Sequence, residues 1–96
     1  MTDLSFLTRL EAVIDVRVDA PPEQSYTARL AAAGDLRAAQ KLAEEGVETA
    51  LAAVAEGRER VVAEAADLIY HLLVLLRLRG ATLADVVAEL ERRHRS

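Results

Sequence analysis

Two pairs of acidic residues in the middle of the chain constrain the fold more than any other feature of this sequence. Glu45 and Glu48 form the first pair, and Glu64 and Asp67 form the second. The i, i+3 spacing places both side chains of a pair on one face of a helix, about one turn apart. Gly57 lies between the pairs and is typical of a break between two helices. If these helices fold back on each other, the four carboxylates meet, and such a cluster repels itself unless it holds a cation.

The residues alone leave the role of these acids open. Hard divalent cations such as Mg2+ take oxygen ligands, so the two pairs predict a metal site. The alternative is an ion-paired surface, because acidic residues at this spacing are usually solvated. His71 is also open: it either bonds a carboxylate near a metal or is a core histidine satisfied by a carbonyl. Lys41 is placed either to contact a phosphate or to pair with Glu45.

Composition indicates a helical protein and excludes several other classes. The 96 residues predict one domain, 1–96. Hydrophobic residues make up 52% but aromatic residues only 3%, so the core must come from Ala, Leu and Val, which favours helix. The absence of cysteine excludes disulfides and thiolate metal sites and is typical of the cytoplasm. The net charge of -4 argues against binding to nucleic acid.

Neither a signal peptide nor a membrane span is expected. The first ten residues lack the basic start and continuous apolar core of a signal sequence. The longest uncharged apolar run, residues 68–76, is far shorter than the roughly 20 residues that a membrane span needs. We therefore expect a soluble cytoplasmic protein that does not bind membranes.

Periodicity and helix breakers predict an all-α bundle of four to five helices. The expected helices are Leu4–Val16 with Asp3 as N-cap, a short helix between Ser25 and Gly34, Asp35–Glu56, Glu59–Leu78, and a last helix that Thr82 and Asp85 start as a capping box. Gly46 lies inside the third of these, where glycine lowers stability by up to about 1 kcal/mol relative to alanine.

Three apolar faces are expected to be buried. The third helix carries a stripe of Leu36, Ala39, Ala43, Val47, Ala50 and Val54. The last helix has Leu83, Val86, Val87 and Leu90 on one face. The fourth helix is apolar almost all round over residues 68–76, which is typical of a helix buried on every side. In so short a chain, such burial predicts a second subunit.

These motifs together resemble the phosphoribosyl-ATP pyrophosphatase family. The residues that carry the resemblance are Ser25-Tyr26-Thr27 with Leu30, Gln40-Lys41, E-E-G-V-E-T at 44–49, and E-A-A-D-L-I-Y-H-L-L-V-L-L at 64–76. The acidic pairs alone are similar to the wider all-α nucleoside triphosphate pyrophosphatase superfamily, the MazG-like group. The Ser-Tyr-Thr segment and the Asp-Leu-x-Tyr-His run narrow the resemblance to this one family.

The resemblance implies Mg2+-dependent hydrolysis of phosphoribosyl-ATP to phosphoribosyl-AMP and pyrophosphate, the second step of histidine biosynthesis, by an intertwined homodimer. It implies that the metal ligands are Glu45, Glu48, Glu64 and Asp67. It also implies that Glu44 assists catalysis and Lys41 contacts phosphate. Weaker candidates for substrate contact are Arg17, Ser25, Tyr26, Thr27 and Arg29.

Two other functions stay open at this point. One is a house-cleaning pyrophosphatase for non-standard nucleoside triphosphates, which would have the same acidic cluster. The other is a non-enzymatic helical dimerisation module whose acids are ion-paired. Some relatives also carry a phosphoribosyl-AMP cyclohydrolase domain with a zinc site. This chain has no cysteine for such a site, so we expect a separate protein to carry out the next step.

Overall fold

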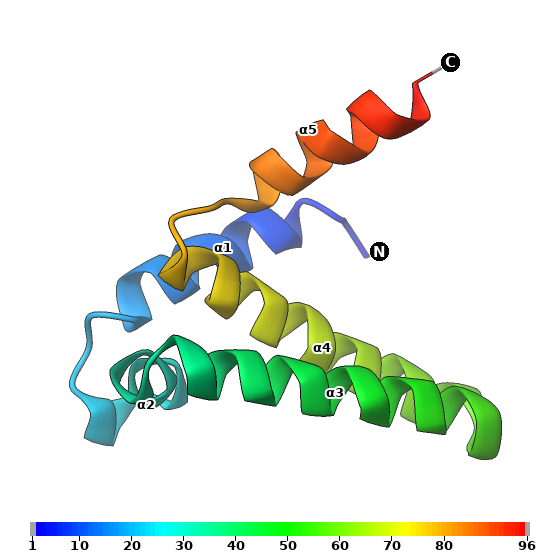
Figure 1. Cartoon of the computed structure of the whole chain (residues 1–96), viewed down its shortest axis with the longest axis horizontal. Coiled ribbons are helices and arrows are strands. Elements are labelled where there is room, and N and C mark those ends of the chain that lie inside the picture. Colours follow the sequence, from blue (N-terminus) through cyan, green and yellow to red (C-terminus); the bar gives the residue numbers. More distant parts are fainter. Residues whose placement is uncertain (1, 96) are drawn as a thin grey trace.

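The computed structural model describes residues 2–95, and all regular structure in that range is helical (Figure 1). The α-helices are α1 (Phe6–Arg17), α2 (Tyr26–Ala33), α3 (Asp35–Ala55), α4 (Arg58–Leu78) and α5 (Leu83–His94), and a short 3-10 helix, η1 (Pro22–Gln24), precedes α2. The predicted all-α fold class is confirmed. Most predicted boundaries match the observed ones or differ from them by one residue.

Local capping chemistry explains where two of the helices begin. Ser25 accepts a hydrogen bond from the backbone N–H of Ala28 at 3.2 Å, which caps α2 as predicted. Thr82 and Asp85 form the expected capping box at the start of α5. Gly34 ends α2 with φ of +97°, a conformation that glycine adopts without steric penalty.

The predicted start of the first helix is wrong by two residues. Helix α1 begins at Phe6 and not at Leu4. Asp3 is not its N-cap, because the Asp3 carboxylate accepts a hydrogen bond from the backbone N–H of Ser5 at 2.9 Å and so closes a turn before the helix.

The two longest helices, α3 and α4, form an antiparallel hairpin, and the other helices gather at one end of it (Figure 1). The core lies at that end, where α1 and α2 pack against the start of α3 and the last turns of α4. Its buried members are Ile14, Leu30, Ala38, Leu73 and Val74. Beyond this core the hairpin continues as two helices packed only on each other.

The face that α3 turns towards α4 is not the predicted one. Ala38, Glu45 and Ala52 are the buried residues of α3, and their seven-residue spacing puts them on one face. The predicted stripe lies on the opposite side of the helix, where Leu36 is 84% and Val54 83% exposed. The other predicted stripe residues, Ala39, Ala43, Val47 and Ala50, are exposed as well. Small side chains let α3 approach α4 closely, so the bulkier residues are left outside.

Helices α4 and α5 are also less buried than their sequences predict. Val62 and Ile69 of α4 are 53% and 41% exposed, so the expected burial on every side does not occur within one chain. Helix α5 has no buried residue: Val87 and Leu90 are exposed, while Leu83 and Val86 are half-buried. The physical reason is the same for both helices, because only the end of α4 near the core is surrounded by other helices.

Within residues 2–95, no helix combines the length and the apolar character that a membrane crossing requires.

Candidate metal centre

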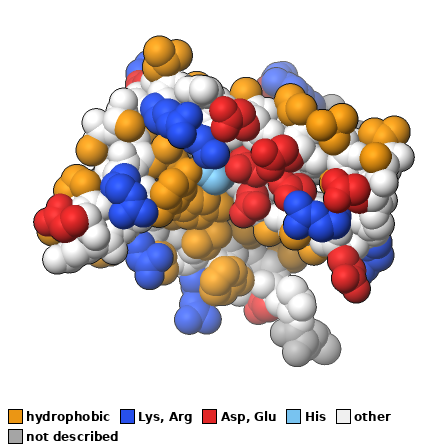
Figure 2. Space-filling model, turned by 90° about the horizontal axis from the view of Figure 1, so that it is seen from below, with side chains coloured by type: hydrophobic (Ala, Val, Ile, Leu, Met, Phe, Trp, Pro, Cys, Tyr) orange, Lys and Arg blue, Asp and Glu red, His pale blue; other side chains and the backbone are white. Residues whose placement is uncertain are grey.

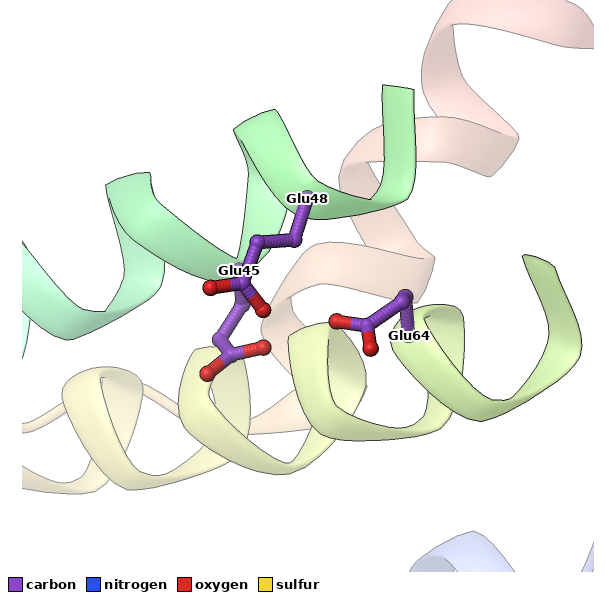
Figure 3. Close-up of side chains that lie close together, drawn as sticks. All are labelled: Glu45, Glu48 and Glu64. Carbon is purple, nitrogen blue, oxygen red and sulfur yellow. The ribbon is translucent and has the colours of Figure 1, made fainter. Parts of the chain in front are cut away.

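Three carboxylates from two helices meet between α3 and α4. Glu45 and Glu48 come from α3 and Glu64 from α4, and one oxygen from each lies within 4.8 Å of the others. Figure 3 shows the three side chains pointing towards one another across the gap between the helices. The hairpin produces this meeting, because Glu48 and Glu64 lie at similar distances on either side of the turn at Gly57.

Burial makes this cluster unfavourable without a cation. Glu45 is 7% and Glu64 6% exposed, and one carboxylate oxygen of each, Oε2, has no hydrogen-bond partner among residues 2–95. A buried acceptor without a donor destabilises a fold, and a buried charge does so more strongly. A set of carboxylate oxygens suits hard divalent cations such as Mg2+, so the residues present fit the predicted metal.

The pKa of Glu64 reflects the same crowding. Glu48 is the largest cause that raises this pKa above its usual value, because only a protonated Glu64 could donate a hydrogen bond to its carboxylate, and burial raises the pKa further. The neighbouring charges of Glu48 and Asp67 act in the same direction, whereas the guanidinium of Arg60 acts in the opposite one. The protein alone therefore resists placing full negative charge on Glu64.

Asp67, the fourth predicted ligand, is not part of this group. Its side chain is exposed one turn after Glu64, and the described group of close carboxylates contains only Glu45, Glu48 and Glu64. Its charge still acts on Glu64 by raising the pKa of that residue. Asp67 lies near the cluster, therefore, but the structure does not bring its carboxylate into it.

Lys41 and Glu44, the predicted catalytic residues, pair with each other at the edge of the cluster. The Lys41 Nζ lies 3.3 Å from Glu44 Oε1 and 3.9 Å from Glu45 Oε1. The hydrogen bond to Glu44 is the largest cause that raises the pKa of Lys41. Gln40 also donates to Glu44, at 3.3 Å. Lys41 thus brings positive charge to the α3 side of the site.

Four of the five weaker candidates for substrate contact line a single hollow of about 510 Å³. These are Arg17, Ser25, Tyr26 and Thr27, and the lining also includes Gln24 and Tyr70. Arg29 does not line it, since its guanidinium donates to the carbonyl of Pro22 at 3.1 Å and lies 5.8 Å from the centre of the Tyr26 ring. Sequence analysis did not select Gln24 or Tyr70, although Tyr70 directly precedes His71 in the Tyr-His motif.

His71 of α4 lies between Tyr26, which lines this hollow, and the backbone of Asp67 one turn earlier on the same helix. It is 6% exposed, with its Nδ1 2.8 Å from the carbonyl oxygen of Asp67 and its Nε2 3.1 Å from the hydroxyl of Tyr26. Because a carbonyl only accepts, Nδ1 carries a proton, and in the neutral ring Nε2 accepts from Tyr26. Of the two interpretations left open, the structure supports the core histidine bonded to a carbonyl. Beside it, the hydroxyls of Thr27 and Tyr70 are hydrogen-bonded to each other.

One further charged residue was missed by sequence analysis. Arg60 donates a hydrogen bond from Nη2 to Glu64 Oε1, and its Nε lies 3.6 Å from Glu56 Oε1. Part of the signal was present in the sequence, since Arg60 and Glu64 have i, i+4 spacing within one predicted helix. Figure 2 shows a group of acidic side chains near the centre of one face of the molecule, with basic side chains on both sides of the group and a histidine at its edge.

Fold and site together define an all-α protein with a carboxylate cluster, suited to a divalent cation, on a helical hairpin beside a hollow lined by hydroxyls and an arginine. The chain belongs to the phosphoribosyl-ATP pyrophosphohydrolase family, whose model matches residues 7–94.

Curated relatives agree with this assignment. The chain is similar to a phosphoribosyl-ATP pyrophosphatase of Pyrobaculum calidifontis, at 60% identity over 91% of this chain and 93% of that protein. It is 52% identical to a phosphoribosyl-ATP pyrophosphatase of Rhizobium rhizogenes, over 91% of this chain and 84% of that one. It is also 49% identical to a histidine biosynthesis bifunctional protein HisIE of Campylobacter jejuni, where 98% of this chain matches 45% of the longer protein.

Proposed function

We propose that this protein hydrolyses phosphoribosyl-ATP to phosphoribosyl-AMP and pyrophosphate with Mg2+, as the second step of histidine biosynthesis. The observation that carries the proposal is the group of three carboxylates with two buried, unpartnered oxygens in a member of this family. The names of the relatives support the substrate.

Glu45, Glu48 and Glu64 are the proposed ligands of Mg2+, and Asp67 is proposed as a further ligand. Bound Mg2+ would polarise a phosphate oxygen and neutralise the charge that develops on the phosphoryl group. The negative charge of the cluster and the positive charge of the metal would offset each other. This is why the buried carboxylates, unfavourable on their own, support the metal assignment.

Lys41 and Glu44 are proposed to act on the phosphate chain at the edge of the cluster. Lys41, with its charge next to Glu45, would bind a phosphate oxygen of the substrate. Glu44, held by Lys41 and Gln40, would assist the attacking water. In the reaction, the water oxygen forms a bond to phosphorus, the anhydride between the α- and β-phosphates breaks, and pyrophosphate leaves.

The hollow around Tyr26 is proposed to bind the part of the substrate that lies away from the metal. Arg17 supplies positive charge for a phosphate, and Ser25, Tyr26 and Thr27 supply hydroxyls for a sugar. Arg29 stays outside the lining and is proposed to act only through its contact with the Tyr26 ring. A compound with phosphate at both ends would use both the hollow and the metal centre.

We also propose that the working form is a homodimer of one-domain subunits in the cytoplasm. The helices α3, α4 and α5 all expose large apolar side chains. They are Leu36, Val47, Leu51 and Val54 of α3, Val62 and Ile69 of α4, and Val87 and Leu90 of α5. We call these eight residues the outer apolar surface. A second copy of this chain would remove this surface from water. A phosphorylated substrate, which does not cross membranes unaided, supports a cytoplasmic location.

Pyrophosphate release from phosphoribosyl-ATP with and without Mg2+ tests this function, beside a panel of ordinary and damaged nucleoside triphosphates. We expect Mg2+-dependent release with clear preference for phosphoribosyl-ATP. If the protein preferred nucleoside triphosphates of the panel, it would instead be a house-cleaning pyrophosphatase. A ligand bound only by the native state must raise the melting temperature. If the protein were inactive on every substrate and Mg2+ did not raise its melting temperature, the non-enzymatic dimerisation module would be the remaining interpretation.

A further inference from the structure

We propose that Arg60 is a built-in counter-cation of the acidic cluster, which a divalent metal displaces from Glu64 and which then stays paired with Glu56 beside the site. The inference rests on the proposed metal site and assigns a role there to a residue outside the predicted ligands. Its evidence lies in the contacts, the burial and the surroundings of Arg60.

The contacts of Arg60 place one guanidinium between two carboxylates. It lies four residues after Glu56, which directly follows the last residue of α3, and one turn before Glu64 on α4. Its Nη2 donates to Glu64 Oε1, while its Nε is 3.6 Å from Glu56 Oε1. Arg60 therefore places a positive charge next to the cluster on α4, while Lys41 places one next to Glu44 and Glu45 on α3.

Arg60 and a metal would compete for the same carboxylate. In Glu64, Oε1 is bonded to Arg60 and Oε2 is buried without a partner among residues 2–95. A divalent cation held by Glu45, Glu48 and Glu64 would lie next to the guanidinium and repel it. Without the metal, the same guanidinium lowers the repulsion among the carboxylates. Arg60 thus stabilises the metal-free state and opposes metal binding.

The surroundings allow Arg60 to move without repacking the protein. Its side chain is 56% exposed, whereas that of Glu64 is 8% exposed. A hollow of about 140 Å³ adjoins it, lined by Glu48, Leu51, Glu56, Arg60 and Glu64. Glu56, at 48% exposure, stays within reach after Glu64 is given up. Rotation of one long side chain therefore suffices to exchange the guanidinium for a metal.

Arg58 provides a matched control for the charge of Arg60. It lies two residues earlier on α4 and is exposed, and it takes part in no ion pair within the described residues 2–95. Arg58→Gln and Arg60→Gln change the net charge equally on the same helix. Only Arg60→Gln removes a group that is bonded to Glu64.

Isothermal titration of the full-length, metal-free protein with MgCl2 tests the proposal, using wild type, Arg60→Gln and Arg58→Gln. We expect Arg60→Gln to bind Mg2+ about two- to fivefold more tightly than Arg58→Gln, as expected for the loss of one partly exposed ion pair. In the absence of Mg2+, Arg60→Gln should melt at a lower temperature than Arg58→Gln, and saturating Mg2+ should raise its melting temperature by more. Circular dichroism checks that both variants are folded.

The outcomes separate this inference from the proposed function. If wild type binds Mg2+ and the two variants bind it equally, or Arg60→Gln binds it more weakly, the counter-cation role is overturned while the metal site stands. If wild type binds no Mg2+ under conditions where it is folded, the metal site and the role of Arg60 are both overturned.

Discussion

At the scale of single residues, Glu45 and Glu64 are unfavourable for folding when no cation is bound. Both are buried acids, and each has a carboxylate oxygen without a hydrogen-bond partner in residues 2–95. A third acid, Glu48, shares the space and helps raise the pKa of Glu64. Such groups lower the stability of the protein by itself, which is typical of positions kept for binding or catalysis.

Removing one proposed metal ligand should abolish activity without unfolding the protein. We predict that Glu48→Gln abolishes Mg2+-dependent turnover and the rise in melting temperature that Mg2+ causes, because an amide replaces a negatively charged ligand. Glu48 is exposed and outside the core, so helix content should be nearly unchanged. Turnover assays, melting curves and circular dichroism measure the three effects.

Asp67→Asn tests the proposed fourth ligand, which the structure leaves outside the close group. We predict that it also abolishes Mg2+-dependent turnover, with helix content nearly intact, since its carboxylate lies one turn from Glu64 and acts on the pKa of that residue. Unchanged turnover in both Glu48→Gln and Asp67→Asn would contradict the metal assignment. Loss of turnover in Glu48→Gln alone would limit the ligands to the three carboxylates that the structure brings together.

At the scale of elements, α3 has two apolar faces on opposite sides, of which one is buried and the other exposed. One face carries Ala38, Glu45 and Ala52 and packs on α4. The opposite face carries large exposed side chains such as Leu36 and Val54. An alternation of small and large apolar residues predicts that the helix is amphipathic, but it does not say which apolar face meets a helix of the same chain.

Gly46 is the weakest point of α3 in terms of helix propensity. A Cβ at this position would lie 3.9 Å from Leu68 Cδ1, which is ordinary van der Waals contact. We predict that Gly46→Ala raises the free energy of unfolding by about 0.4–1 kcal/mol and leaves Mg2+-dependent turnover unchanged. Chemical denaturation measures the stability.

Gly34→Ala is the control for this prediction. A Cβ at Gly34 would meet no atom within 4 Å, but the φ of +97° there is unfavourable for alanine. We expect this second change to destabilise the protein. If Gly46→Ala were equally destabilising, close packing at Leu68 and not helix propensity would control the position.

At the scale of the whole molecule, the outer apolar surface is the main feature that one chain does not explain. The core is confined to one end of the α3–α4 hairpin, and α5 extends away from it with no buried residue (Figure 1). Apolar surface spread over three helices is typical of a protein whose folded unit includes a partner.

A charge placed in the outer apolar surface should therefore break the proposed homodimer. Light scattering during size exclusion should give a mass of twice 10.4 kDa for wild type and a smaller one for Val54→Glu. Leu4→Glu is the matched control, because Leu4 is 82% and Val54 83% exposed but Leu4 lies outside that surface. A wild type of single-chain mass, or equal masses for all three proteins, would contradict the proposed interface.

The sequence by itself determined the helices, the caps of α2 and α5, and the spacing of the acids. These depend on interactions over one or two turns: Ser25 and Thr82 cap neighbouring N–H groups, and an i, i+3 pair lies on one face wherever the helix goes. The family motifs likewise indicated the function that the comparisons support. Of the site, Glu45, Glu48 and Glu64 were predicted as a cluster and are found as one.

Only the tertiary structure decided which helix faces turn inward and which charges meet. It placed the predicted stripe of α3 outside, left Asp67 at the edge of the cluster, added Tyr70 to the hollow and set Arg60 against Glu64. These outcomes depend on the rotation of one helix about its axis relative to another, which the helical repeat does not specify. That rotation is set by the fit of side chains across the α3–α4 contact, where small residues allow the closest approach.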